Sequence, residues 1–185
     1  MAFLFIAYNT LLRISNIARL QVKDLIFNRD GSVMLNIGYT KTIVDGQGIT
    51  KALSPRASAS LLRWLNVAGL IDHHDAYIFC KVHRVNKAII TTAKPLTRPN
   101  LERIFSAAWA VVQGDKKGVE NKGRYTTWTG HSARVGAAQD MTESGYSLAQ
   151  IMHEGTWTKA ETVLGYIRHI EAKKSVMIDL VEGKS

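Results

Sequence analysis

The chain has 185 residues, 46% of them hydrophobic, which is enough for one domain with an apolar core. Its 24 Lys and Arg residues outnumber its 15 Asp and Glu residues, for a formal net charge of +9. This excess favours an anionic partner, either nucleic acid or an acidic membrane surface; a charge that serves solubility alone is the alternative. The single cysteine, Cys80, excludes an intrachain disulfide and a cysteine-based metal site, and it fits a reducing compartment.

The start of the chain is apolar but carries neither the basic residues nor the cleavage pattern of a signal peptide. No apolar run approaches the ~20 residues that a membrane span needs. We therefore expect a cytoplasmic protein that does not enter a membrane. The apolar run also begins without a capping residue, which favours a longer parent protein whose N-terminal part is absent from this chain.

The first elements in chain order are a helix and two strands. Apolar residues at three- and four-residue spacing predict a helix over residues 2–20. Alternating residues predict a strand over 33–37, and a second strand over 49–53 follows a glycine-rich turn. The two strands indicate a small antiparallel sheet, with Lys41 close to its turn.

The remainder of the chain is predicted to be helical. Helices are expected over residues 56–69, from Thr97, over about 130–144, from Ser147 and from Thr158. Thr97 is a suitable N-cap, and the segments that begin at Ser147 and Thr158 read as capping boxes. Residues 113–126 are polar and rich in glycine, which is typical of an exposed loop, and a short amphipathic segment lies near 172–181. The predicted fold class is mainly α with a small antiparallel β-sheet.

His131 and Arg134 are three residues apart in one predicted helix, so both can face the same anion. This spacing alone is a weak signal, because a surface pair gives it equally well. It gains weight from Trp157 and Tyr166, which each follow a helix-start signal, and from Arg13 and Lys41 upstream.

In this order the six residues resemble the signature of the tyrosine recombinases of the phage integrase family. The stretches 6–14, 130–138 and 166–168 are also similar to members of that family, and the similarity extends over nearly the whole chain. The resemblance implies the tyrosine recombinase catalytic-domain fold over residues 1–185. The core-binding domain that precedes it in the family is expected to be absent from this chain.

The resemblance also implies a reaction and a role for each residue. Family members cut and rejoin DNA through a 3′-phosphotyrosine, with no metal ion, cofactor or ATP. Tyr166 corresponds to the nucleophile and Lys41 to the general acid. Arg13, Arg134 and Trp157 correspond to residues that bind the scissile phosphate. His131 corresponds to a residue that donates to the same phosphate or assists proton transfer from the tyrosine. Taken singly, each has an ordinary explanation as a solvated cation, a core tryptophan or a half-buried tyrosine.

Two positions depart from the family pattern. Asn16 stands where the family has an acidic residue, and Thr156 stands where similar members have glycine before the tryptophan. An amide at position 16 retains hydrogen bonding but adds no negative charge to the site. We therefore expect Asn16→Glu to raise cleavage activity; unchanged or lower activity would argue against a supporting role for this position.

Other cations are expected to contact DNA. By the resemblance, Arg98 corresponds to an arginine that reads a guanine in the major groove, an interaction of about 1–3 kcal/mol; an exposed arginine at a helix start is the alternative. Four further cations are expected to meet phosphates: Lys81, Arg84, Lys87 and Arg124. The histidines outside the signature show no spacing that indicates a metal site.

The segment near 172–181 resembles the C-terminal helix that related recombinases lend to a neighbouring protomer. We expect a tetramer on DNA for the full-length parent and a monomer for this chain alone. Two other functions are the alternatives. A non-catalytic DNA-binding remnant of a prophage recombinase is favoured by Asn16 and the missing domain, but the intact set of catalytic residues argues against it. A tyrosine-type topoisomerase is disfavoured by the length of the similarity.

Overall fold

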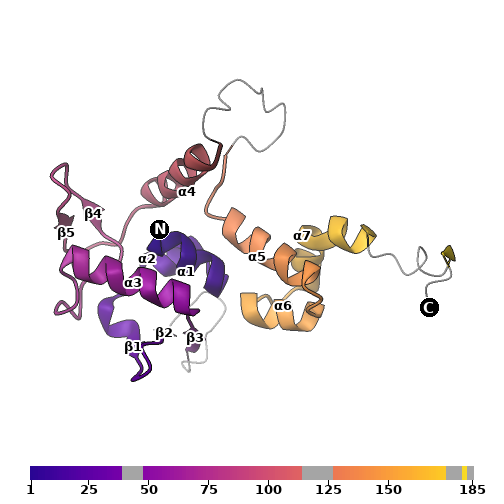
Figure 1. The fold of residues 1–185 in the computed structure, drawn as a ribbon, viewed down its shortest axis with the longest axis horizontal. Helices are drawn as coiled ribbons and strands as arrows, with labels where there is room; N and C mark the ends of the chain where they lie inside the picture. Colours follow the sequence, from indigo (N-terminus) through magenta and orange to yellow (C-terminus); the bar gives the residue numbers. More distant parts are fainter. Residues whose placement is uncertain (39–47, 114–126, 174–180, 183–185) are drawn as a thin grey trace.

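The computed structural model describes residues 1–38, 48–113, 127–173 and 181–182. It is mostly helical with a small antiparallel sheet, as the sequence predicts. Lys41, Arg124 and most of the predicted C-terminal segment lie outside the described residues. In Figure 1 the elements from α1 to α4 form one part of the molecule, and α5, α6 and α7 form a second part beside it.

The prediction of one helix over residues 2–20 is wrong, because two helices occupy this segment. Helix α1 (Ala2–Thr10) ends at Leu11, whose left-handed backbone (φ 51°) stops helical propagation. Helix α2 (Ile14–Ala18) begins after Arg13, which is extended and serves as its N-cap residue. The Thr10 hydroxyl donates to the Ile6 carbonyl and accepts from the Leu12 amide, which supports the break.

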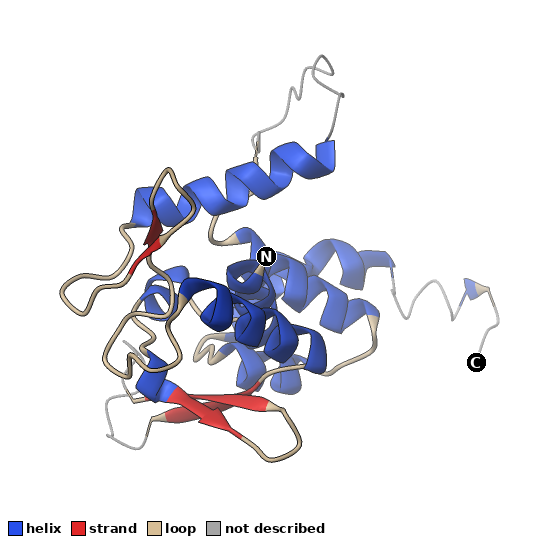
Figure 2. Cartoon of the chain, turned by 60° about the vertical axis from the view of Figure 1, so that its left-hand side comes forward, coloured by secondary structure: helices blue, strands red, loops and turns tan. Residues whose placement is uncertain are grey.

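Three strands form the main sheet, in the order β1-β2-β3. After a short 3-10 helix (Val22–Asp24), β1 (Leu25–Phe27) pairs antiparallel with β2 (Val33–Ile37), which pairs with β3 (Ile49–Ala52). The two predicted strands are present. Strand β1 was not predicted, because only three residues form it and two of them are exposed. Figure 2 shows the sheet on one side of the helices and α4 on the other.

Helices α3 and α4 complete the larger part. Helix α3 (Pro55–Ala68) begins at Ser54, whose hydroxyl accepts from the Ala57 amide, and ends at the left-handed Gly69. An unpredicted hairpin of β4 (Lys81–Val82) and β5 (Ala88–Ile89) precedes α4 (Arg98–Gln113), which begins one residue after Thr97. The hairpin has strands of only two residues, too short for a period to appear in the sequence.

The second part consists of α5 (Ser132–Glu143), α6 (Leu148–Gly155) and α7 (Ala160–Lys173), close to the predicted bounds. The predicted capping box at Ser147 is formed with Gln150. Tyr166 lies on the second turn of α7, as predicted.

Each part has its own apolar core. The larger core includes Ile6, Leu35, Leu61 and Phe105 and draws on helices α1 to α4 and on strands β1 and β2. The smaller core consists of Ala138, Ile151, Val163 and Ile167. Helix α1 also contacts α5, and the Tyr8 hydroxyl on α1 donates to the Asp140 carboxylate on α5. Burial and this hydrogen bond raise the pKa of Tyr8 to about 12.

None of the helices in the described ranges is long and apolar enough to cross a membrane.

Candidate active site

Among the predicted site residues that the structure describes, Arg134 is the most buried, with 4% of its surface exposed. It lies in the first turn of α5 and donates hydrogen bonds to two backbone carbonyls. Nη1 donates to Leu11, at the break between α1 and α2, and Nη2 donates to Gly155 at a distance of 3.1 Å. Burial and the nearby Arg13 lower the pKa of Arg134 to about 10, so the guanidinium stays charged at neutral pH.

The break in the first helix provides one of these acceptors. In a continuous helix the Leu11 carbonyl would accept from an amide four residues later. The left-handed turn at Leu11 instead leaves this carbonyl to Arg134. The same break places Arg13 at the start of α2, with its side chain exposed.

Trp157 packs against the buried guanidinium. The Arg134 Cζ atom lies 4.5 Å from the centroid of the indole ring, an arrangement that a cation–π interaction stabilises. Gly155 makes room for the ring, since a Cβ atom there would lie 1.9 Å from Trp157. Thr156 between them has a left-handed backbone (φ 52°), a conformation that glycine adopts more easily. The left-handed backbone gives a physical reason for the glycine that the family pattern predicts at position 156.

The rings of His131 and Tyr166 are in contact within the site. Their ring centroids are 5.2 Å apart with an edge-on orientation, and the Tyr166 ring also lies edge-on to Trp157 at 6.0 Å. His131 is exposed and precedes α5, whereas Tyr166 is half-buried on α7 against the smaller core. Desolvation, followed by the charges of Arg134 and Arg13, lowers the pKa of His131 below its ordinary value. The imidazole is therefore mainly neutral at pH 7.

Five of the six predicted catalytic residues line one pocket of about 280 Å³. The described residues that line it include no carboxylate. They are Arg13, His131, Arg134, Thr156, Trp157, Thr158, Lys159, Thr162 and Tyr166. Two guanidiniums, an ammonium, an indole N–H and hydroxyl groups suit a compact anion such as phosphate.

A second pocket of about 480 Å³ shares Arg13, His131 and Arg134 with the first. It extends along α2 and the start of α4, where it also meets Arg19 and Arg98. Arg98 is exposed and pairs with Glu102 at 3.5 Å, and Glu102 accepts the Gly130 amide beside His131. Arg98 therefore lies next to the candidate site.

Three of the other predicted DNA contacts lie elsewhere, and Arg124 is outside the described residues. Lys81, Arg84 and Lys87 are exposed on the β4–β5 hairpin, away from the 280 Å³ pocket. Asn16 is half-buried in the first turn of α2, three residues after Arg13. No group of three or more metal-binding side chains occurs in the described ranges.

Sequence reasoning missed Lys159, Thr158 and Thr162, which line the 280 Å³ pocket beside Tyr166. Their position in the chain between Trp157 and Tyr166 could have indicated that they lie near the site. It also missed the hydrogen bonds that the Gly155 and Leu11 carbonyls accept from Arg134. A backbone carbonyl that accepts from a distant arginine has no characteristic sequence pattern.

Comparisons with known proteins identify a family and several relatives. The phage integrase family matches residues 1–173. The chain is 42% identical to the recombinase Cre of Escherichia phage P1 over 182 residues, which cover 98% of this chain and 52% of that protein.

Two solved recombinases share the fold at low sequence identity. The XerH site-specific recombinase bound to a palindromic difH substrate has a TM-score of 0.66 at 15% identity, covering 98% of this chain and 45% of that one. The XerA recombinase has a TM-score of 0.61 at 17% identity, covering 89% and 51%. The chain thus spans about half the length of the relatives that it matches.

Proposed function

Because the chain belongs to the phage integrase family, we propose that it is the catalytic domain of a site-specific DNA recombinase. It cuts and rejoins DNA strands by transesterification through a 3′-phosphotyrosine on Tyr166. The observation that carries this proposal is the convergence of Tyr166, His131 and two arginines on one pocket, whose described lining residues include no carboxylate. We propose that residues 1–185 form a single domain of a longer protein.

The bond changes in the proposed reaction balance within the DNA and Tyr166. The phenol oxygen attacks the phosphorus atom and forms a phosphotyrosine, while the bond to the 5′ oxygen breaks and that oxygen takes up a proton. Arg13 and Arg134 stabilise the negative charge that gathers on the non-bridging oxygens. Arg134 suits this task because two backbone carbonyls hold its guanidinium in place before substrate binds.

Two proton transfers accompany the step. His131, neutral at pH 7, accepts the phenol proton or donates an N–H to the phosphate. Lys41 is proposed as the general acid for the leaving oxygen; it lies outside the described residues. Trp157 donates its indole N–H toward the phosphate, and its ring packs on Arg134.

The partner is proposed to be double-stranded DNA in the cytoplasm. Arg98 is proposed to read a base, and Lys81, Arg84, Lys87 and Arg124 to bind phosphates. The position of Arg98 in the pocket beside Arg13 and His131 supports its part in this interface. We propose that the full-length protein forms a tetramer on DNA through the segment near 172–181, and that this chain alone is a monomer.

A pool of nicked DNA duplexes with a randomised sequence around the nick tests the proposal. A nick beside the cleavage point lets the short strand diffuse away, so the covalent adduct accumulates. We expect adduct with the wild-type chain on a restricted set of sequences and none with Tyr166→Phe. Adduct on every sequence would favour the topoisomerase, and DNA binding without adduct would favour the non-catalytic remnant.

A further inference from the structure

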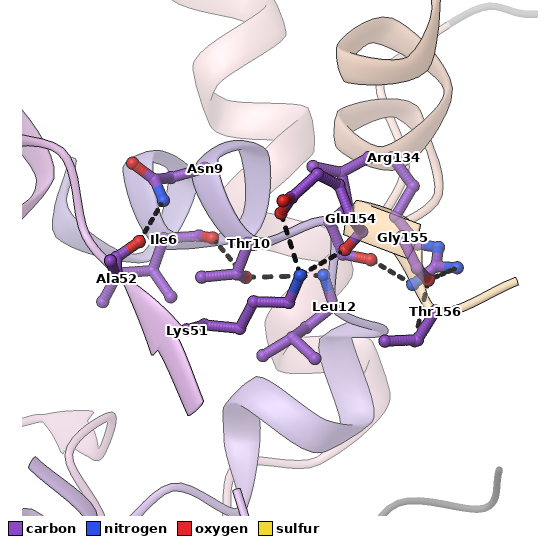
Figure 3. Close-up of polar contacts among 11 residues, drawn as sticks. Ile6, Asn9, Thr10, Leu12, Lys51, Ala52, Arg134, Glu154, Gly155 and Thr156 are labelled. Carbon is purple, nitrogen blue, oxygen red and sulfur yellow. Dashed lines mark hydrogen bonds and ion pairs between the residues drawn. The ribbon is translucent and has the colours of Figure 1, made fainter. Parts of the chain in front are cut away.

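Lys51 is a buried lysine on the core-facing side of the sheet. It lies on β3 opposite the fully buried Leu35, and its side chain is only 9% exposed. Its ammonium reaches out of the sheet to α6, where it donates to the Glu154 backbone carbonyl at 2.6 Å and to the Glu154 carboxylate at 3.0 Å. Figure 3 shows this contact beside the Arg134 hydrogen bonds. A buried ammonium is costly unless it is paired, so the contact holds β3 and α6 together.

The contact completes the hydrogen bonding at the C-terminus of α6. The last four carbonyls of a helix have no partner within it. In α6 the Met152 and His153 carbonyls accept from the backbone amides of the following turn, those of Trp157 and Thr156. The Glu154 carbonyl accepts from Lys51, and the Gly155 carbonyl accepts from Arg134. Two distant cations thus bind consecutive carbonyls at the negative end of one helix dipole.

Strand β3 is also tied to the segment that carries the other carbonyl bound by Arg134. The side-chain amide of Asn9, on α1, donates to the Ala52 carbonyl at 3.0 Å, and its oxygen accepts from the Ser54 amide at 2.8 Å. Asn9 precedes Leu11 by a few residues in the chain. The two acceptors of Arg134 therefore belong to segments that are both tied to β3, one by Asn9 and one by Lys51 (Figure 3).

We propose that Lys51 is a positioning residue of the phosphate pocket. By holding Glu154, it fixes the neighbouring Gly155 carbonyl that orients Arg134, together with the turn that presents Trp157. Lys51 does not line the 280 Å³ pocket, so it acts through Arg134 and not on the DNA. This inference rests on the proposed function, since it concerns the same site.

The test compares three substitutions in the full chain. Lys51→Met keeps an unbranched side chain and removes the donor, and Glu154→Gln keeps the backbone acceptor but removes the ion pair. Lys23→Met is the matched control, because Lys23 pairs with Asp75 at 2.8 Å on the exposed surface, outside the pocket. Adduct formation is measured on the nicked duplex pool at saturating DNA, with DNA affinity and thermal unfolding measured in parallel.

We expect Lys51→Met to slow adduct formation about tenfold or more at unchanged DNA affinity, because a small displacement of Arg134 misaligns the phosphate. Glu154→Gln should slow it less, and Lys23→Met should match the wild type. Lys51→Arg, which restores charge and donors, should recover part of the rate. A wild-type rate in Lys51→Met, or parallel losses of rate and affinity, would overturn the inference.

A second measurement does not depend on cleavage. Nitrogen-15 NMR of the arginine side chains reports the restricted rotation of the Arg134 guanidinium between its two carbonyls. Lys51→Met should relax this restriction and Lys23→Met should not; an unaltered Arg134 signal in Lys51→Met would also overturn the inference. If the wild-type chain formed no adduct, the proposed function would fail while this measurement still decided the role of Lys51.

Discussion

The two parts of the molecule differ both in the size of their apolar cores and in the groups that they carry. The larger core extends from α1 to α4 and the sheet, whereas the smaller one has four buried members among the described residues. Yet His131, Arg134, Trp157 and Tyr166 all belong to the smaller part, and the larger part contributes Arg13. The reacting groups thus depend on polar contacts across the boundary more than on a large core of their own.

These contacts are specific in a way that apolar packing is not. Arg134 reaches the Leu11 carbonyl, Lys51 reaches Glu154, and Tyr8 reaches Asp140. Each joins a residue of the larger part to one of the smaller. A hydrogen bond depends on direction as well as distance, so these contacts fix the orientation of α5 and α6.

Among the substitutions that test this difference between the two parts, matched substitutions in the two cores should have the largest effect on stability. Leu61 and Ile167 are at most 1% exposed, in the larger and smaller core respectively. Replacing either by alanine should cost about 2–5 kcal/mol of unfolding free energy. Hydrogen exchange should show reduced protection throughout the chain for Leu61→Ala, and in α5–α7 alone for Ile167→Ala. Equal losses everywhere in both variants would mean that the two parts unfold as one unit.

Gly155→Ala should disturb the boundary itself. The added methyl group would lie 1.9 Å from the Trp157 ring, so the ring must move off Arg134. We expect a loss of about 1–3 kcal/mol of stability from overpacking and a drop of about a hundredfold in adduct formation. Gly165→Ala on α7 is the control, since a Cβ atom there meets nothing within 4 Å. Wild-type cleavage by Gly155→Ala would refute this account of the turn.

Thr156→Gly should have a smaller and opposite effect on stability. A left-handed backbone destabilises a β-branched residue by about 1–2 kcal/mol, and glycine removes this strain. Glycine also loses more conformational entropy on folding, so the net increase in unfolding free energy should be about 0.5–1 kcal/mol. Leu11→Gly provides the comparison in the larger part. Leu11 has the same backbone conformation but is 4% exposed, so loss of its burial should outweigh the relief of strain. Urea unfolding measures both; destabilisation by Thr156→Gly would contradict the argument.

The pH dependence should show the smallest effect. Partial desolvation, followed by the charges of Arg134 and Arg13, lowers the pKa of His131, so between that pKa and 6.5 the unfolded chain binds more protons than the folded one. The contribution of His131 to stability therefore decreases as the pH falls through this interval and stays constant below it. We expect His131→Gln to remove this part of the pH dependence in urea unfolding. An identical pH dependence in the variant would exclude His131 as its source.

The sequence predicts the helices with clear periodicity and caps, and the capping box at Ser147 is formed as expected. It fails at Leu11, where the apolar spacing continues through a break that tertiary contacts stabilise. It also fails at β1, β4 and β5, which are too short to show a period. The identities of the site residues were predicted from their order in the chain, but the placement of Arg134 depends on the carbonyls of Leu11 and Gly155, which the sequence does not indicate. Lys41 and Arg124 remain predictions.

The break at Leu11 has a consequence for anyone who tries to stabilise this protein. Residues 2–20 have the apolar spacing of a single helix, and a design procedure that rewards local regularity would complete it. The completed helix would use the Leu11 carbonyl for its own hydrogen bonding and withdraw it from Arg134. Greater local order in this segment would then leave the guanidinium without one of its two supports.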